Sequence, residues 1–171
     1  MSPRLRAFSF AVLLVLAGLG AYAAGTWLRP APALAGTLLQ QPPHVGDLEL
    51  VAADGREVTL AEVRGEATLT LVFFGFTNCP DVCPITMARL AKVYETLADP
   101  QGVRVVMITV DPEVDPPEVI GRYAAAFHPD FVGLGGDSGQ IAVAARSFYV
   151  GYASVGGNQF THTDVVAVVD D

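Results

Sequence analysis

The sequence is poor in cysteine, histidine and basic residues. Its 171 residues include two cysteines, three histidines and 10 lysines or arginines, against 18 aspartates and glutamates. Folds that are held together by disulfides need several bridges, so one cysteine pair excludes that class and points to a chemical use of the pair. The acidic balance argues against nucleic acid as a partner, because a phosphate backbone attracts basic surfaces.

The first 29 residues contain no acidic side chain. Arg4 and Arg6 precede residues 7–28, a run of 22 residues without a charge. About 20 apolar residues span a bilayer, and positive charges before such a run keep that end in the cytoplasm. We therefore expect residues 1–29 to form a membrane anchor that leaves the rest of the chain outside the cytoplasm. A cleaved signal peptide is the alternative, since Ala21-Tyr-Ala23 and Ala33-Leu-Ala35 resemble cleavage sites.

The remaining chain divides into a linker, residues 30–46, which is rich in proline, and a single domain, residues 47–171. Apolar runs predict strands and amphipathic stretches predict helices. The expected strands are 48–52, 57–60, 68–76, 103–110, 131–134, 149–152 and 164–169, and the expected helices are 85–97, 117–127 and 138–148. Asp54-Gly55 predicts a hairpin between the first two strands. The alternation that follows predicts an α/β sheet with parallel crossovers.

The two cysteines lie four residues apart in Cys79-Pro-Asp-Val-Cys83-Pro84, directly after an apolar strand and before a helix. A helix N-terminus favours thiolate over thiol, so both sulfurs are expected to be reactive. Such a pair can form a disulfide or bind a soft metal ion. Asp81, between the cysteines, is expected either to cap the helix or to tune the site by disfavouring thiolate through its like charge. A cysteine pair at the first strand–helix junction of an α/β sheet suggests a thioredoxin-like fold.

His162 precedes the last predicted strand, and an ordinary loop histidine is one interpretation of it. In a thioredoxin-like sheet, however, the loop that enters this strand lies against the cysteine turn. Two sulfurs and one imidazole nitrogen suit Cu(I) and also tolerate Cu(II). Thioredoxin-type reductases place a cis-proline in this loop, and no proline follows Pro129 here. This absence weakens the interpretation as a general disulfide reductase.

With these features the chain resembles the Sco (SenC-type) family, the membrane-anchored copper chaperones of cytochrome c oxidase assembly. The resemblance covers roughly residues 46–170 and the anchor. The matching segments are Phe73-Phe-Gly-Phe-Thr77, Cys79-Pro-Asp-Val-Cys83-Pro84, Thr109-Val-Asp-Pro-Glu113 with Asp115 and Pro116, Tyr123-Ala-Ala-Ala-Phe127, Phe131-Val-Gly-Leu134 and Thr161-His-Thr163.

The resemblance implies that Cys79, Cys83 and His162 are copper ligands. The acidic residue that the family has near this site falls on Asp115, in a segment that begins at Asp111; turn formation is an equally good explanation of both aspartates. The resemblance also implies a single-pass protein of the inner membrane with its domain in the periplasm. Its implied partners are a copper donor protein and subunit II of cytochrome c oxidase, whose CuA centre would receive the copper.

Two other functions remain open. Cys79 and Cys83 could be the redox pair of a thiol–disulfide oxidoreductase that reduces the oxidase subunit or another exported partner, and only the copper chaperone requires His162. A peroxiredoxin-like peroxidase shares the same fold and a cysteine nucleophile. The sequence also departs from the family, whose members usually continue with another strand and a C-terminal helix. We therefore expect that helix to be missing, with apolar surface left exposed.

Overall fold

The computed structural model describes residues 9, 12–22, 36–156 and 159–170, but not the side chains of residues 154–162. The chain forms two compact units, residues 1–40 and 41–171. In the first unit, residues 12–22 are helical and exposed. Within the described residues, no helix is both long and apolar enough to cross a membrane. Much of the predicted anchor falls outside the described residues.

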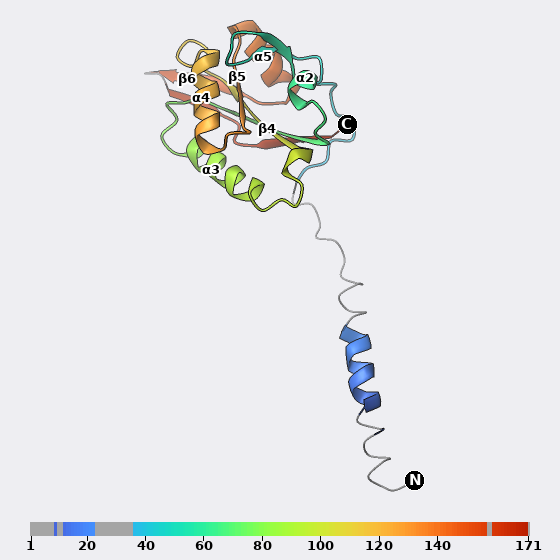
Figure 1. Ribbon diagram of the computed structural model, residues 1–171. Helices are drawn as coiled ribbons and strands as arrows, with labels where there is room; N and C mark the ends of the chain where they lie inside the picture. The colour runs from blue at the N-terminus through green and yellow to red at the C-terminus, as the bar shows by residue number, and fades with distance from the viewer. Residues whose placement is uncertain (1–8, 10–11, 23–35, 157–158, 171) are drawn as a thin grey trace. The chain divides into compact units, whose positions relative to one another are not determined.

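The second unit is built around a four-stranded sheet of order β5-β4-β3-β8 (Figure 1). Its strands are β3 (Leu69–Gly75), β4 (Val103–Thr109), β5 (Val132–Leu134) and β8 (Val166–Val169). β3, β4 and β5 run parallel, and β8 is antiparallel to β3. The prediction of a thioredoxin-like α/β sheet with parallel crossovers is confirmed. β3 and β4 are nearly continuous apolar runs because both faces of these strands are covered.

Helices cover both faces of this sheet. The helices are α3 (Val82–Tyr94), α4 (Pro117–Phe127) and α5 (Ser138–Ser147), and α3 contacts α4 (Figure 1). Gly75 of β3 approaches Cys83 of α3, whereas the neighbouring Phe74 packs against Phe148, which directly follows α5, with ring centroids 5.5 Å apart. Successive side chains of a strand point to opposite faces, so α3 and the end of α5 lie on opposite sides of the sheet.

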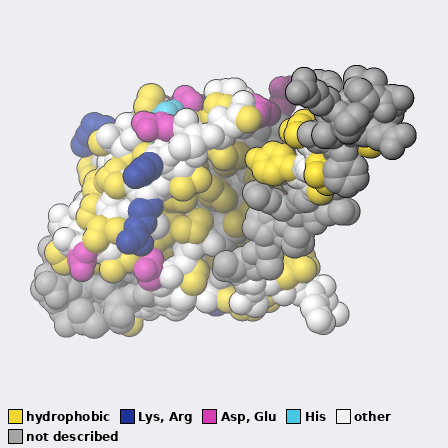
Figure 2. Space-filling model, turned by 90° about the horizontal axis from the view of Figure 1, so that it is seen from below, with side chains coloured by type: hydrophobic (Ala, Val, Ile, Leu, Met, Phe, Trp, Pro, Cys, Tyr) yellow, Lys and Arg dark blue, Asp and Glu magenta, His cyan; other side chains and the backbone are white. Residues whose placement is uncertain are grey.

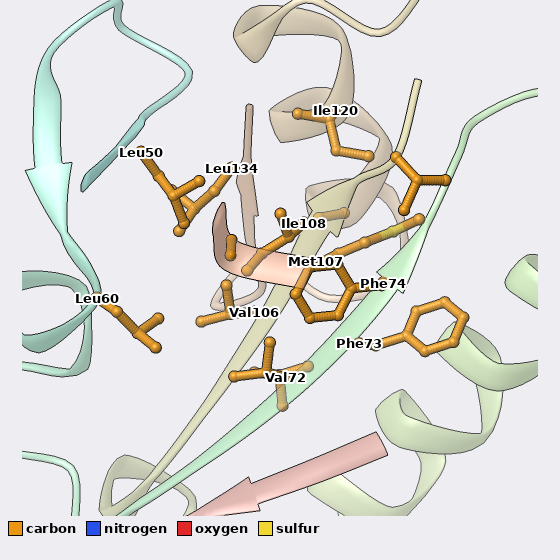
Figure 3. Packing of buried hydrophobic residues seen from close by; sticks show 14 of the residues in the cluster. Leu50, Leu60, Val72, Phe73, Phe74, Val106, Met107, Ile108, Ile120 and Leu134 are labelled. Atoms are coloured by element: carbon orange, nitrogen blue, oxygen red, sulfur yellow. The ribbon is translucent and has the colours of Figure 1, made fainter. Parts of the chain in front are cut away.

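The predicted N-terminal hairpin is confirmed. β1 (Glu49–Val51) pairs with β2 (Glu57–Thr59), and Gly55 in the turn has a φ of 84°. The prediction missed the short helix α2 (Leu60–Arg64), in which Thr59 and Glu62 form a capping box. Leu50 of β1 and Leu60 of α2 are buried near Val72 and Val106 of the sheet (Figure 3). The hairpin therefore closes one side of the core.

The chain after α5 differs from the prediction. The strand predicted at 149–152 begins only at Tyr152, and β6 (Tyr152–Gly156) pairs with β7 (Gln159–His162) in a separate two-stranded sheet. His162 therefore ends a strand and does not lie within a loop. His162 pairs with Tyr152. The sequence pattern did not show the second strand, because the glycines beside it interrupt the pattern. A short 3-10 helix, η1 (Pro100–Gly102), was also not predicted.

Apolar side chains are exposed beside α3. Val168 of β8 is 63% exposed and Leu69 of β3 is 37% exposed, and the register that pairs Leu71 with Val168 places them on the same face. Figure 2, a view from below Figure 1, shows hydrophobic side chains with lysines and arginines among them on the underside of the molecule. Apolar side chains of β3 and β8 are thus exposed on this face of the sheet, whereas the absence of a C-terminal helix stays a prediction.

Candidate metal and thiol site

The two cysteines meet at the N-terminus of α3. Cys79 lies in the turn after β3 and is half-buried, whereas Cys83 lies in the first turn of α3 and is fully buried. The Cys83 amide donates a hydrogen bond to the Cys79 sulfur over 3.3 Å. Asp81 occupies the N-cap position, but its side chain makes no capping hydrogen bond. The prediction that the Asp81 side chain caps the helix is therefore wrong: the Cys79 sulfur accepts the Cys83 amide of the first turn instead.

The environment of Cys83 disfavours its thiolate. Burial raises the pKa of the Cys83 thiol well above its ordinary value, and the hydrogen bond with the Cys79 side chain acts in the same direction. The expectation that the helix N-terminus makes both sulfurs thiolates is wrong for Cys83. A helix terminus contributes about 0.3–1 kcal/mol, whereas full burial can shift a pKa by several units. The metal-free protein keeps this thiol protonated.

Close packing fixes the position of the Cys83 sulfur. A Cβ atom placed on Gly75 would lie 2.9 Å from Cys83 Sγ and 2.9 Å from Met107 Cε. The strand can therefore approach the cysteine helix only because residue 75 has no side chain. Sequence reasoning did not assign a role to Gly75, although its place in an otherwise bulky apolar strand was the available signal.

Asp111 and Asp115 are buried in the segment after β4, and Asp115 contacts the cysteine turn. The Asp115 carboxylate accepts a hydrogen bond from the Thr77 amide over 2.8 Å, one from the Thr77 hydroxyl, and one from the Thr109 hydroxyl over 3.1 Å. Burial raises the pKa of Asp111, and the neighbouring charge of Asp115 raises it further. Thr77 lies two residues before Cys79, so Asp115 contacts the cysteine turn. Whether either aspartate acts on a metal stays a prediction.

Tyr123 is a residue that sequence reasoning did not assign to the site. It comes from α4, and its ring packs against Phe127 with centroids 5.2 Å apart. Burial raises the pKa of Tyr123 to about 12, and the acidic groups of Cys83, Cys79 and Asp115 act in the same direction. Its phenol is therefore within electrostatic range of the cysteine pair. The signal in the sequence was its place in one of the segments that matched a known family.

The side chain of His162, the predicted third ligand, lies outside the described residues. The chain next to His162 is partly defined. Thr163 and Gly151 exchange hydrogen bonds. Burial is the largest cause of the raised pKa of Cys83, and the charge of Asp164 is a smaller one. Asp164, two residues beyond His162, thus lies close enough to affect the cysteine pair. Among the side chains that the structure describes, no three His, Cys, Asp or Glu residues are grouped to hold a metal ion.

The other two histidines do not join the site. The exposed His44 lies 3.3 Å from Asp47. His128 follows α4, stacks edge-on against Tyr94 and accepts a hydrogen bond from the Asp130 amide. Neither has a described contact with the cysteines.

A cysteine pair where the central strand meets a helix, in a sheet of order β5-β4-β3-β8, defines a thioredoxin-like domain with a thiol site. The chain belongs to the SCO1/SenC family, whose model matches residues 37–171.

Relatives and solved structures agree with this family. A SCO2-like protein of Rickettsia felis is 37% identical over 152 residues, which cover 86% of this chain and 73% of that relative. The apo Sco1 protein of Thermus thermophilus is 41% identical, with a TM-score of 0.68 over 79% of this chain and 80% of its own. Bradyrhizobium japonicum ScoI, solved with copper bound, is 32% identical, with a TM-score of 0.67 over 76% of this chain and 83% of its own. The chain spans about half the length, or less, of several further curated relatives.

Proposed function

We propose that this protein is a copper chaperone that binds one copper ion through Cys79, Cys83 and His162. The observation that carries the proposal is the meeting of the two cysteines at the start of α3, where the Cys83 amide contacts the Cys79 sulfur. Two thiolates and one imidazole form a soft ligand set that suits Cu(I), and Cu(II) is tolerated. The copper bound by Bradyrhizobium japonicum ScoI, a relative of similar fold, supports copper as the metal.

Copper uptake by this site releases a proton from Cys83. A metal ligand must be a thiolate, and burial keeps the Cys83 thiol protonated in the absence of metal. The metal ion replaces this proton, and its positive charge stabilises the buried thiolate. Release of copper to a partner then returns the proton to Cys83.

The partner that we propose is subunit II of cytochrome c oxidase, whose CuA centre receives the copper, and a separate donor protein loads the site. In this proposal residues 7–28 anchor the chain in the inner membrane and hold the domain in the periplasm. Support comes from family membership and from the two arginines that precede the uncharged run.

Copper stoichiometry and affinity of three variants test the ligand set. We expect Cys79→Ser and Cys83→Ser to abolish tight Cu(I) binding, measured by competition with a chromophoric chelator. His162→Ala is expected to weaken it by at least about tenfold, because an imidazole is lost from a site of three ligands. His44→Ala is the matched control, since His44 is exposed and paired with Asp47. A serine variant that holds copper as tightly as the parent would exclude the proposed site.

The second candidate is a thiol–disulfide oxidoreductase, which the unequal exposure of the two cysteines favours. Cys79 is half-buried and can meet a partner disulfide, whereas Cys83 is buried and can resolve the mixed disulfide afterwards. His162→Ala separates the two functions, because thiol exchange depends on the sulfurs alone. We expect His162→Ala to keep thiol exchange and to lose copper delivery; unchanged copper affinity and delivery would remove the histidine from the site and favour the reductase.

A further inference from the structure

Asp115 connects the two loops that follow neighbouring strands of the sheet. β3 and β4 are parallel, with Gly75 opposite Thr109, so the loops that leave them start side by side. The loop after β4 turns back on itself through the Asp115 amide, which donates to the Asp111 carbonyl over 2.9 Å. This turn brings the Asp115 side chain to Thr77, in the loop after β3. The contact spans 38 residues of sequence.

The Asp115 carboxylate is fully buried, and Thr77 and Thr109 provide three donors to it, none of them charged. A buried carboxylate is tolerated only where donors replace the water that it has lost. Two of the three donors belong to Thr77, one from the backbone and one from the side chain. The carboxylate therefore holds both the position and the orientation of this residue.

Thr77 transmits this constraint to Cys79. Only Asn78 separates the two residues, and the Cys79 amide donates to the Phe76 carbonyl over 3.3 Å, which closes the turn on itself. The Cys79 sulfur then accepts the Cys83 amide at the start of α3. A continuous series of contacts thus runs from Asp115 through Thr77 and Cys79 to the helix.

We propose that Asp115 and Thr77 are positioning residues that hold the Cys79 sulfur against the first turn of α3. Copper capture, which rests on the proposed function, would use this arrangement, because the Cys79 sulfur is held beside the Cys83 sulfur before the metal arrives. Thr109 contacts the same carboxylate from the strand, so it supports Asp115 without touching the cysteine turn. The Thr109 hydroxyl also accepts a hydrogen bond from the Asp111 amide over 3.0 Å, so Thr109 supports the loop after β4, whereas Thr77 connects that loop to Cys79.

The equilibrium of the Cys79–Cys83 disulfide with glutathione tests this proposal without metal. One molecule of glutathione disulfide accepts two electrons and two protons from the two thiols, which gives the protein disulfide and two glutathione thiols. The equilibrium constant measures how well the two sulfurs are held together. We expect Thr77→Val and Asp115→Asn to lower it about tenfold, the effect of losing a hydrogen bond to a charged group. Thr77→Ser keeps both donors and should retain the parent value.

Thr109→Val is the matched control, because it removes a hydroxyl donor from the same carboxylate. We expect it to lower the free energy of unfolding, measured in urea, at least as much as Thr77→Val does, while the disulfide equilibrium stays within about twofold of the parent. If Thr109→Val and Thr77→Val change the equilibrium equally, Asp115 is a structural residue and the proposal is wrong. An unchanged equilibrium in Thr77→Val would also overturn it.

Copper affinity of the same variants distinguishes failure of this proposal from failure of the proposed function. Parent protein that binds no copper but shows the expected disulfide pattern would exclude the chaperone and keep the positioning role. Parent protein that binds copper, with Thr77→Val unchanged in both measurements, would keep the chaperone and exclude the positioning role. Should Asp115→Asn fail to fold, Thr77→Val and Thr77→Ser alone decide the outcome.

Discussion

Replacing Gly75 with alanine tests how tightly the thiol site is packed. The new Cβ atom would lie 2.9 Å from Cys83 Sγ, 2.9 Å from Met107 Cε and 3.0 Å from Phe73 Cε1. Non-bonded carbon atoms prefer about 3.5–4.0 Å, so each neighbour has to move by roughly 0.5–1 Å. All three neighbours are fully buried and have little room to move.

The expected loss of stability follows from this overlap. Overpacking of a buried site costs about 1–3 kcal/mol, and the lower chain entropy of unfolded alanine offsets about 0.4–1 kcal/mol of it. We therefore expect Gly75→Ala to lower the free energy of unfolding by about 1–2 kcal/mol, measured by urea denaturation of the metal-free protein. The displaced Cys83 sulfur should also weaken copper binding.

Gly46→Ala provides the control for this change. A Cβ atom on Gly46 would meet Ala61 Cβ and the His44 ring at 3.5 Å, which is ordinary contact, so its stability should stay within about 0.5 kcal/mol of the parent. Equal stability of Gly75→Ala and Gly46→Ala would refute the packing of Cys83 against β3. A loss of stability without any change in copper binding would refute only the link between packing and the metal site.

Two further predictions concern acidity and packing. The pKa of Cys83 is raised in the folded state, so the unfolded chain loses its Cys83 thiol proton at a lower pH than the folded protein does. The free energy of unfolding of the metal-free protein should therefore fall above the unfolded thiol pKa of about 8.5, by at most ~1.4 kcal/mol per pH unit. The parent should lose stability more steeply than Cys83→Ser in urea titrations at pH 7.5–10, and parallel curves would contradict the burial of this thiol. Gly133→Ala would place a Cβ atom 2.1 Å from the Ile120 carbonyl oxygen, a backbone atom that cannot rotate away. We expect it to cost more than about 3 kcal/mol and to shift α4, and a near-parental urea midpoint would contradict the close contact of α4 with β5.

Much of the architecture could be predicted because it depends on local patterns. The apolar runs 68–76 and 103–110 correspond to β3 and β4, and Pro117 does open α4. Asp137 caps α5 through a capping box with Gln140, directly before the helix expected at 138–148. Hydrophobic periodicity and end signals belong to a few adjacent residues, so they can be recognised without the fold.

The predictions from the sequence were wrong where tertiary packing outweighed a local pattern. Asp81 has the residue type and position of a helix cap, yet the Cys79 sulfur accepts the nearby amide. Cys83 has the position of a reactive thiolate, yet its burial raises its pKa. The β6–β7 hairpin was missed because the neighbouring glycine-rich segments show little alternation of apolar and polar residues. Its two strands form a small sheet of their own, apart from the central sheet.

The sequence by itself determined the cysteine pair, its place between a strand and a helix, and the family resemblance that the comparison with known proteins confirms. Only the tertiary structure decided that the Asp115 carboxylate accepts hydrogen bonds from Thr77 and that Gly75 admits the Cys83 sulfur. These relations join residues that are far apart along the chain. They exist because parallel pairing of β3 and β4 places the ends of the two strands side by side, and no local pattern of residues encodes which side chains then meet.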